Sequence, residues 1–260
     1  MSEQVVLRKE RDIAWLVLNR PEKRNALNLA MWQRLPDLLA EVERDRDVKV
    51  LVVRGADAGA FSAGADISEF EELRSTPEGA RRYNDTSERA EHALRNLSKP
   101  TIALVQGPCI GGGCGLAVAC DLRFCDDTAR FGITPAKLGI VYSFQATKAL
   151  VDTVGPSNAK EILFTGLHVP ADRALHMGLV NAIVPAAELE SHVTDIASTI
   201  ASRAQSSVRA TKRITRLILD GLADDDEESR QLRIGSFTSQ DYREGVRAFL
   251  EKRPPDFTSS

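Results

Sequence analysis

The chain has 260 residues, 43% of them hydrophobic, so it is long enough to bury a full core without disulfides or structural metals. Its formal net charge of −3 comes from 34 basic and 37 acidic residues mixed along the chain, which argues against a nucleic-acid partner. No run of about 18 apolar residues predicts a membrane span, and the first residues lack the order of a signal peptide. We therefore expect a cytoplasmic protein with no membrane partner.

The first third of the chain predicts the start of an α/β unit. The apolar runs Val5–Arg8 and Ile13–Leu18 flank a charged turn, which is typical of a β-hairpin. A helix with Asn28 as its N-cap is expected next, because apolar residues then recur at three-and-four spacing. The run VKVLVVR over residues 48–54 predicts another strand. With only 5% aromatic residues, this order of elements favours the α/β class.

Two glycine-rich turns follow predicted strands. GADAGAFSAGAD spans residues 55–66, and GGGCG at residues 111–115 joins the strand TIALVQ to a helix of small residues. Each turn alone is equally compatible with an ordinary tight loop. If the two converge, their backbone N–H groups can bind one carbonyl oxygen and stabilise the charge of an enolate. GGGCG lacks the glycine spacing of a dinucleotide or P-loop site.

The second half predicts short strands alternating with helices, and then helices alone. Strands are expected at residues 122–125 and 180–184, and helices at residues 145–154, 157–164 and 171–177. We divide the chain into an α/β core, residues 1–195, and a helical C-terminal region, residues 196–260. Surplus apolar positions in that region, such as Ile214, Leu217, Ile218 and Phe249, predict a homo-oligomer.

The cysteines do not form a metal-binding pattern. Cys109, Cys114, Cys120 and Cys125 include no C-x-x-C pair and have no companion histidines, so we expect reduced thiols and no metal site.

Several segments, in order and over nearly the whole chain, resemble blocks of the crotonase (enoyl-CoA hydratase/isomerase) superfamily. They are NRPEKRNALN at 19–28, AFSAGADI at 60–67, GPCIGGGCGLAVACD at 107–121, FTG at 164–166 with ALHMGLV at 174–180, and SQDYREGVRAFLEKR at 239–253. The resemblance implies a spiral of ββα units in two sheets. It also implies C-terminal helices that form a homotrimer or a dimer of trimers.

The same resemblance implies an acyl-CoA thioester as the ligand, with coenzyme A as part of the substrate and no separate cofactor. It places an oxyanion hole on the amides of Ala65 and Gly112. The positions that match segments lining coenzyme A are Arg24, Ala26, Ala63, Asp66 and Ile67. Lys252 matches a basic position that in the family can reach the ligand of a neighbouring subunit.

The chain departs from the hydratase pattern at two positions. Hydratases of this family carry two glutamates there, whereas this chain has Gly115 at the first and, in an ungapped comparison, Pro135 at the second. Neither residue can transfer a proton, and general acid–base catalysis typically supplies about 10²–10⁴-fold. We therefore expect weak or absent hydration of crotonyl-CoA. The oxyanion hole still favours an enolate formed without a strong base, of which decarboxylation is the plainest case.

The run TPAKLGIVY at residues 134–142 resembles methylmalonyl-CoA decarboxylase-like members, in which the tyrosine that matches Tyr142 faces the substrate carboxylate. A partly buried structural tyrosine is the alternative. Further polar candidates are Thr134, Ser143, Glu69 and Glu72. The sequence thus predicts a lyase or isomerase that stabilises a thioester enolate with non-standard chemistry. A non-catalytic acyl-CoA-binding protein and a structural scaffold remain as alternatives.

Overall fold

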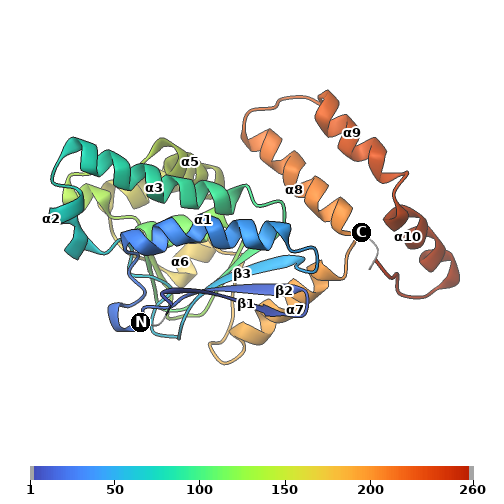
Figure 1. Cartoon of the computed structure of the whole chain (residues 1–260), viewed down its shortest axis with the longest axis horizontal. Helices are drawn as coiled ribbons and strands as arrows, with labels where there is room; N and C mark the ends of the chain where they lie inside the picture. Colours follow the sequence, from blue (N-terminus) through green and yellow to red (C-terminus); the bar gives the residue numbers. More distant parts are fainter. Residues whose placement is uncertain (1–2, 258–260) are drawn as a thin grey trace.

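The computed structural model describes residues 3–257, which form an α/β core and a group of C-terminal helices beside it (Figure 1). A six-stranded sheet has the order β1-β2-β3-β4-β6-β9, and a three-stranded sheet has the order β5-β7-β8. The strands are β1 (Val5–Glu10), β2 (Ile13–Leu18), β3 (Val50–Gly55), β4 (Thr101–Val105), β5 (Pro108–Ile110), β6 (Leu122–Cys125), β7 (Arg130–Gly132), β8 (Val169–Pro170) and β9 (Ala182–Ile183).

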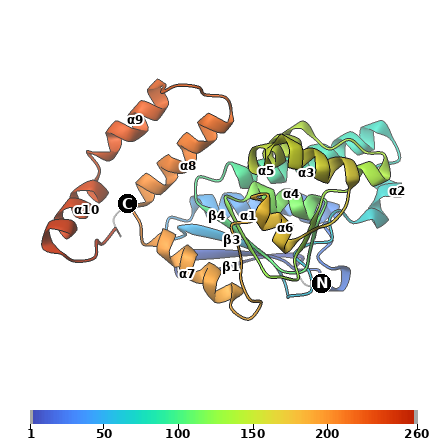
Figure 2. The same ribbon diagram turned by 180° about the vertical axis from the view of Figure 1, so that it is seen from behind.

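Helices cover both faces of the larger sheet and extend beyond it (Figure 2). The α-helices are α1 (Leu29–Arg44), α2 (Phe70–Leu73), α3 (Pro77–Arg95), α4 (Gly112–Ala119), α5 (Phe144–Thr165), α6 (Ala171–His176), α7 (Leu189–Ala201), α8 (Gln205–Leu219), α9 (Glu227–Ser236) and α10 (Gln240–Glu251). Short 3₁₀ helices are η1 (Pro21–Lys23), η2 (Ile67–Glu69) and η3 (Pro135–Leu138).

Strand β2 shows why the sheet needs cover on both sides. All six of its residues are buried, and alternate side chains enter two different clusters. Leu16 and Leu18 pack in the cluster that contains helix α1, whereas Trp15 packs in the cluster that contains α7. Because successive residues of a strand point to opposite faces, a continuous apolar run fits a strand between two helical layers.

The predicted elements of the core are present. β1 and β2 pair as an antiparallel hairpin, and the other neighbours in the six-stranded sheet pair in parallel. The side chain of Asn28 accepts a hydrogen bond from the amide of Met31 and caps α1. The two helices expected at residues 145–154 and 157–164 form one element, α5, which is interrupted at Gly155 where φ is 75°. Proline at residue 156 and this left-handed glycine explain the break.

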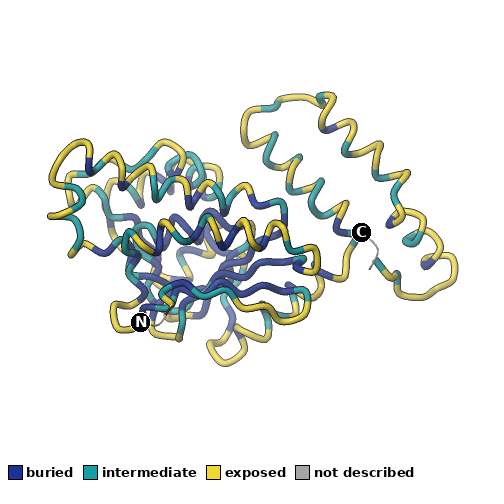
Figure 3. The backbone as a smooth tube through the Cα atoms, in the orientation of Figure 1, coloured by how far each residue is buried: buried dark blue, intermediate teal, exposed yellow. Residues whose placement is uncertain are grey.

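Helix α7 spans residue 195, where the sequence places the end of the core. It packs on the sheet through Leu189, Val193 and Ala197. The helices that extend away from the core begin with α8 at Gln205, and they are mostly exposed (Figure 3). Within residues 3–257, no helix combines the length and apolar character that a membrane crossing needs.

Candidate active site

Backbone pairing fixes the two glycine-rich turns against each other. The amide of Ser62 donates to the carbonyl of Pro108 at 3.0 Å, and the amide of Ile110 donates to the carbonyl of Ser62 at 2.9 Å. Gly64 has a φ of 96°, and a Cβ built on it would lie 2.8 Å from the carbonyl oxygen of Ile110. Only glycine combines this conformation with so close an approach, so the contact between the turns depends on it.

Two backbone amides remain open in this arrangement. The amides of Ala65 and Gly112 donate to no protein acceptor among residues 3–257, although the next amide, that of Asp66, donates to the carbonyl of Leu27. Gly112 is the first residue of α4, where N–H groups lack partners within the helix. Both residues line one cavity of about 250 Å³. Two residues whose amides have no described acceptor thus border the same cavity.

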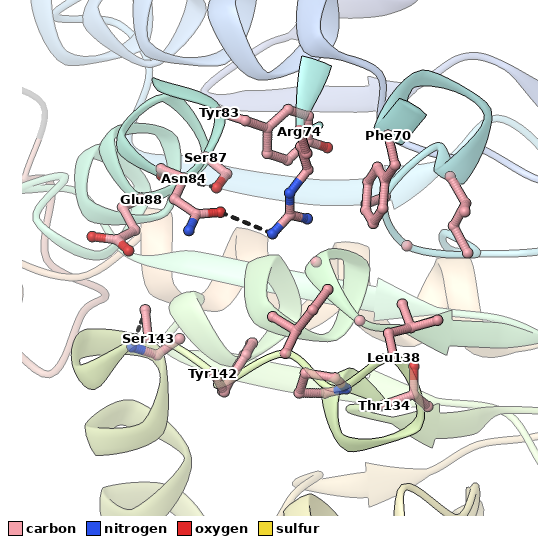
Figure 4. Close-up of a pocket in the computed structure, with 18 of the residues that line it drawn as sticks. Phe70, Arg74, Tyr83, Asn84, Ser87, Glu88, Thr134, Leu138, Tyr142 and Ser143 are labelled. Atoms are coloured by element: carbon pink, nitrogen blue, oxygen red, sulfur yellow. Dashed lines mark hydrogen bonds between the residues drawn. The ribbon is translucent and has the colours of Figure 1, made fainter. Parts of the chain in front are cut away.

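The cavity lies between two walls (Figure 4). One wall comes from α2 and α3 and contains Phe70, Arg74 and Tyr83. The opposite wall comes from the segment around η3 and contains Leu138 and Tyr142. The lining is mainly apolar with a few polar groups, a composition typical of a small-molecule site.

The carboxyl group of Glu91, from α3, lies beside Gly115. A Cβ built on Gly115 would lie 2.3 Å from Oε1 of Glu91 and 3.1 Å from Oη of Tyr142. Glu91 is 9% exposed and lines the cavity. Burial raises the pKa of Glu91 to about 7, with Arg95 acting in the opposite direction. A group able to take or give a proton near neutral pH therefore lies in the space that a side chain at residue 115 would need.

Tyr142 supplies a hydroxyl next to this carboxyl group. Its Oη is buried and has no hydrogen-bond partner among the described residues. Burial, and then the charge of Glu91, hold the pKa of Tyr142 well above its usual range. The phenol therefore stays protonated and remains available to donate a hydrogen bond to a ligand.

The residues predicted from the sequence fall into two groups. Those that line the cavity are Ala63, Ala65, Ile67, Gly112 and Tyr142. Four other predicted residues do not line the described cavity: Arg24, Ala26, Asp66 and Lys252. Asp66 is buried and accepts a hydrogen bond from Nη2 of Arg20 at 2.9 Å, so its carboxylate holds the first turn in place.

Of the polar candidates named from the sequence, two line the cavity and two do not. Thr134 and Ser143 line the cavity. Glu69 does not: its Oε2 accepts a hydrogen bond from the amide of Leu29 at 2.8 Å, so its carboxylate caps α1. Glu72 is exposed and does not line the cavity either. Neither candidate glutamate therefore supplies a carboxylate to the cavity in this structure, and Glu72 has the exposed position on a charged helix that is the alternative for it.

Glu91 was not predicted from the sequence, although the residues around it on α3 indicate that it is buried. It lies on α3 among Tyr83, Ala90 and Leu94, which are buried and, at spacings of seven and four residues, share one face of the helix. A glutamate inside such an apolar stripe is rarely a surface residue. The four cysteines are free and buried, and no group of metal-ligating side chains occurs among the residues that the structure describes.

Comparison with known proteins gives consistent matches along the chain. The Enoyl-CoA hydratase/isomerase family profile matches residues 8–260. A crotonyl-CoA hydratase of Syntrophomonas wolfei is 36% identical over 261 residues, covering 99% of this chain and 98% of the relative. A short-chain-enoyl-CoA hydratase of Clostridium acetobutylicum is 36% identical over 254 residues, covering 96% of this chain and 95% of the relative. The crystal structure of an enoyl-CoA hydratase/isomerase family protein from Hyphomonas neptunium superposes with a TM-score of 0.96 at 43% identity. The superposition covers 99% of this chain and 98% of that protein.

Proposed function

The chain belongs to the enoyl-CoA hydratase/isomerase family, and on that basis we propose that it is a lyase or isomerase that forms a thioester enolate and uses Glu91 for proton transfer at the α-carbon. The observation that carries the proposal is the position of the Glu91 carboxyl group, 2.3 Å from where a Cβ of residue 115 would lie. Gly115 leaves room for a carboxyl group that arrives from a different helix.

The mechanism begins at the thioester carbonyl. Its oxygen accepts hydrogen bonds from the amides of Ala65 and Gly112, which stabilise the negative charge that develops in the enolate. The ionised Glu91 removes a proton from the α-carbon, and the neutral Glu91 returns one. A pKa of about 7 suits both steps, because both protonation states are then populated near neutral pH.

Residue 135, where hydratases of the family carry their second glutamate, bears no proton-transfer group, and this limits which reactions the site can support. Pro135 provides no second acid or base on the opposite wall, so we expect only weak hydration of crotonyl-CoA. Isomerisation needs one group, because the proton that leaves one carbon can return to another.

Decarboxylation is the second candidate, and the unpartnered hydroxyl of Tyr142 favours it. That hydroxyl can donate to a substrate carboxylate. The bond between the α-carbon and the carboxyl group breaks, CO₂ leaves, the electron pair remains in the enolate, and neutral Glu91 protonates the α-carbon.

Exchange of the α-protons of butyryl-CoA in D₂O tests the proposal without knowledge of the natural substrate. We expect mass spectrometry to show deuterium incorporation by the wild type and a rate at least about 10²-fold lower in Glu91→Gln. Glu72→Gln, which changes an exposed glutamate outside the cavity, is the matched control. Binding of butyryl-CoA with no exchange would instead support a non-catalytic acyl-CoA-binding protein.

A panel of enoyl-, 3-hydroxyacyl- and malonyl-type CoA esters, with products identified by mass spectrometry, then distinguishes isomerisation from decarboxylation. Loss of CO₂ from a malonyl-type ester that falls sharply in Tyr142→Phe would favour decarboxylation. Strong hydration of crotonyl-CoA that survives in Glu91→Gln would contradict the proposed role of Glu91.

A further inference from the structure

Arg74 is a cation in the cavity wall without an ion-pair partner. It follows α2 directly and lines the cavity. Its Nη2 donates to Oδ1 of Asn84 at 3.2 Å, and its Cζ lies 4.4 Å from the ring centroid of Phe70 and 5.1 Å from that of Tyr83 (Figure 4). Among residues 3–257, no carboxylate forms an ion pair with Arg74.

These contacts hold the guanidinium in place without neutralising it. Two aromatic rings and one amide oxygen fix its position, while most of its five N–H donors remain available. A planar guanidinium matches the two oxygens of a carboxylate and binds them with charge-assisted hydrogen bonds. Glu88 also lines the cavity, but it does not pair with Arg74. Arg74 therefore has no carboxylate partner among the described residues, and a ligand can supply one.

The position of Asn84 indicates where on the substrate that charge lies. Asn84 and Glu91 are seven residues apart on α3, which corresponds to about 10 Å along the helix. Glu91 acts at the α-carbon in the proposed mechanism. An anion bound by Arg74 and Asn84 is therefore remote from the α-carbon, at a distance that an acyl chain of several carbons can span.

We propose that Arg74 and Asn84 bind a terminal carboxylate, so that the substrates are coenzyme A thioesters of dicarboxylic acids. This inference rests on the proposed function for the placement of the thioester.

Binding of paired saturated esters to the purified protein tests the inference. Adipyl-CoA and hexanoyl-CoA have the same number of acyl carbons and differ in the terminal group, and glutaryl-CoA with pentanoyl-CoA and suberyl-CoA with octanoyl-CoA extend the series. We expect calorimetry to show at least about tenfold tighter binding of the dicarboxylic ester in one pair, as a charge-assisted hydrogen bond provides. Arg74→Met should bring that ratio to about 1, and Arg74→Lys should keep part of it.

Arg82→Met is the matched control, because Arg82 is an exposed arginine of α3 that does not line the cavity. It should leave the ratio unchanged. Equal affinity of the wild type for both members of every pair would overturn the inference. An equal loss of affinity for both members of a pair in Arg74→Met would also overturn the inference, since Arg74 would then bind a phosphate of coenzyme A. Tight binding of a dicarboxylic ester without α-proton exchange would contradict the proposed function alone.

Discussion

At the scale of single residues, Glu91 combines its proposed role in proton transfer with a cost in stability. A carboxyl group that is almost fully buried resists ionisation, and Arg95 only partly offsets that resistance. No described residue donates a hydrogen bond to the carboxyl group of Glu91. Such a group is kept where a substrate makes use of it, because a neutral side chain of the same shape would stabilise the fold more.

The pH dependence of stability should reveal this cost when Glu91→Gln is compared with the wild type. The pKa of Glu91 is about 7 in the folded protein against 4.5 for the free group, so the folded state binds the proton more tightly. The contribution of protonated Glu91 to the stability of the folded protein is fully present below about pH 4.5. It is lost as the pH rises through 7. We expect the free energy of unfolding of the variant to exceed that of the wild type by about 3 kcal/mol at pH 8. Near pH 4.5 the two values should be almost equal. Denaturant unfolding at both pH values measures this, and a difference independent of pH would contradict the interpretation.

The space at Gly115 can be tested separately. In Gly115→Ala the new methyl group would meet Oε1 of Glu91 at 2.3 Å, so the flexible glutamate must move away from the cavity. We expect α-proton exchange to fall at least about tenfold, because proton transfer depends on position. Adding Glu91→Gln to this variant should reduce the rate less than it does in the wild type. Gly235→Ala is the control, since a Cβ at that glycine of α9 meets nothing within 4 Å.

At the scale of elements, the sequence predicts most of the core because its apolar patterns are local. The buried run of β2 and the cap of α1 at Asn28 are set by neighbouring residues in the chain. The location of Glu91 is not local, because it depends on α3 lying against α4 across a glycine at residue 115. A single sequence contains the glutamate and the glycine but does not state that they meet.

Ser62 links the first turn to the chain before α1, and its loss should loosen the turn. Its Oγ donates to the carbonyl of Asn25 at 2.8 Å and accepts from the amide of Gly64 at 3.2 Å, all in the buried interior. Ser62→Ala leaves both partners without a bond, so we expect a loss of about 1–3 kcal/mol in the free energy of unfolding. Acyl-CoA affinity should fall too, because Ala65 directly follows Gly64, whose amide the Ser62 hydroxyl holds. Ser236→Ala, which removes an exposed bond within α9, is expected to change neither quantity.

At the scale of the whole molecule, the C-terminal helices differ from the rest of the chain. Helix α8 buries only Gln205, α9 only Ser229, and α10 only Asp241 and Ala248 within the described protomer. Large apolar side chains on these helices are exposed, among them Ile234 at 52% and Phe249 at 82%. Helix α7, by contrast, buries its apolar face on the sheet. A layer of helices with so little core of its own is expected to pack against other subunits.

These exposed helices predict an oligomer, and the family resemblance implies a homotrimer or a dimer of trimers. We expect the exposed pair Phe249 and Leu250 to help hold it together. Burying each side chain contributes about 1.5–3 kcal/mol, whereas a charge at the same place opposes association. Light scattering at micromolar concentration should give a mass of three or six chains for the wild type and a smaller mass for the double variant Phe249→Glu and Leu250→Glu. Arg46→Glu, which introduces a negative charge in place of a positive one at an exposed loop of the core, should keep the wild-type mass. A wild type that scatters as a monomer would show that these helices remain uncovered, and the assembly inferred from them would then be wrong.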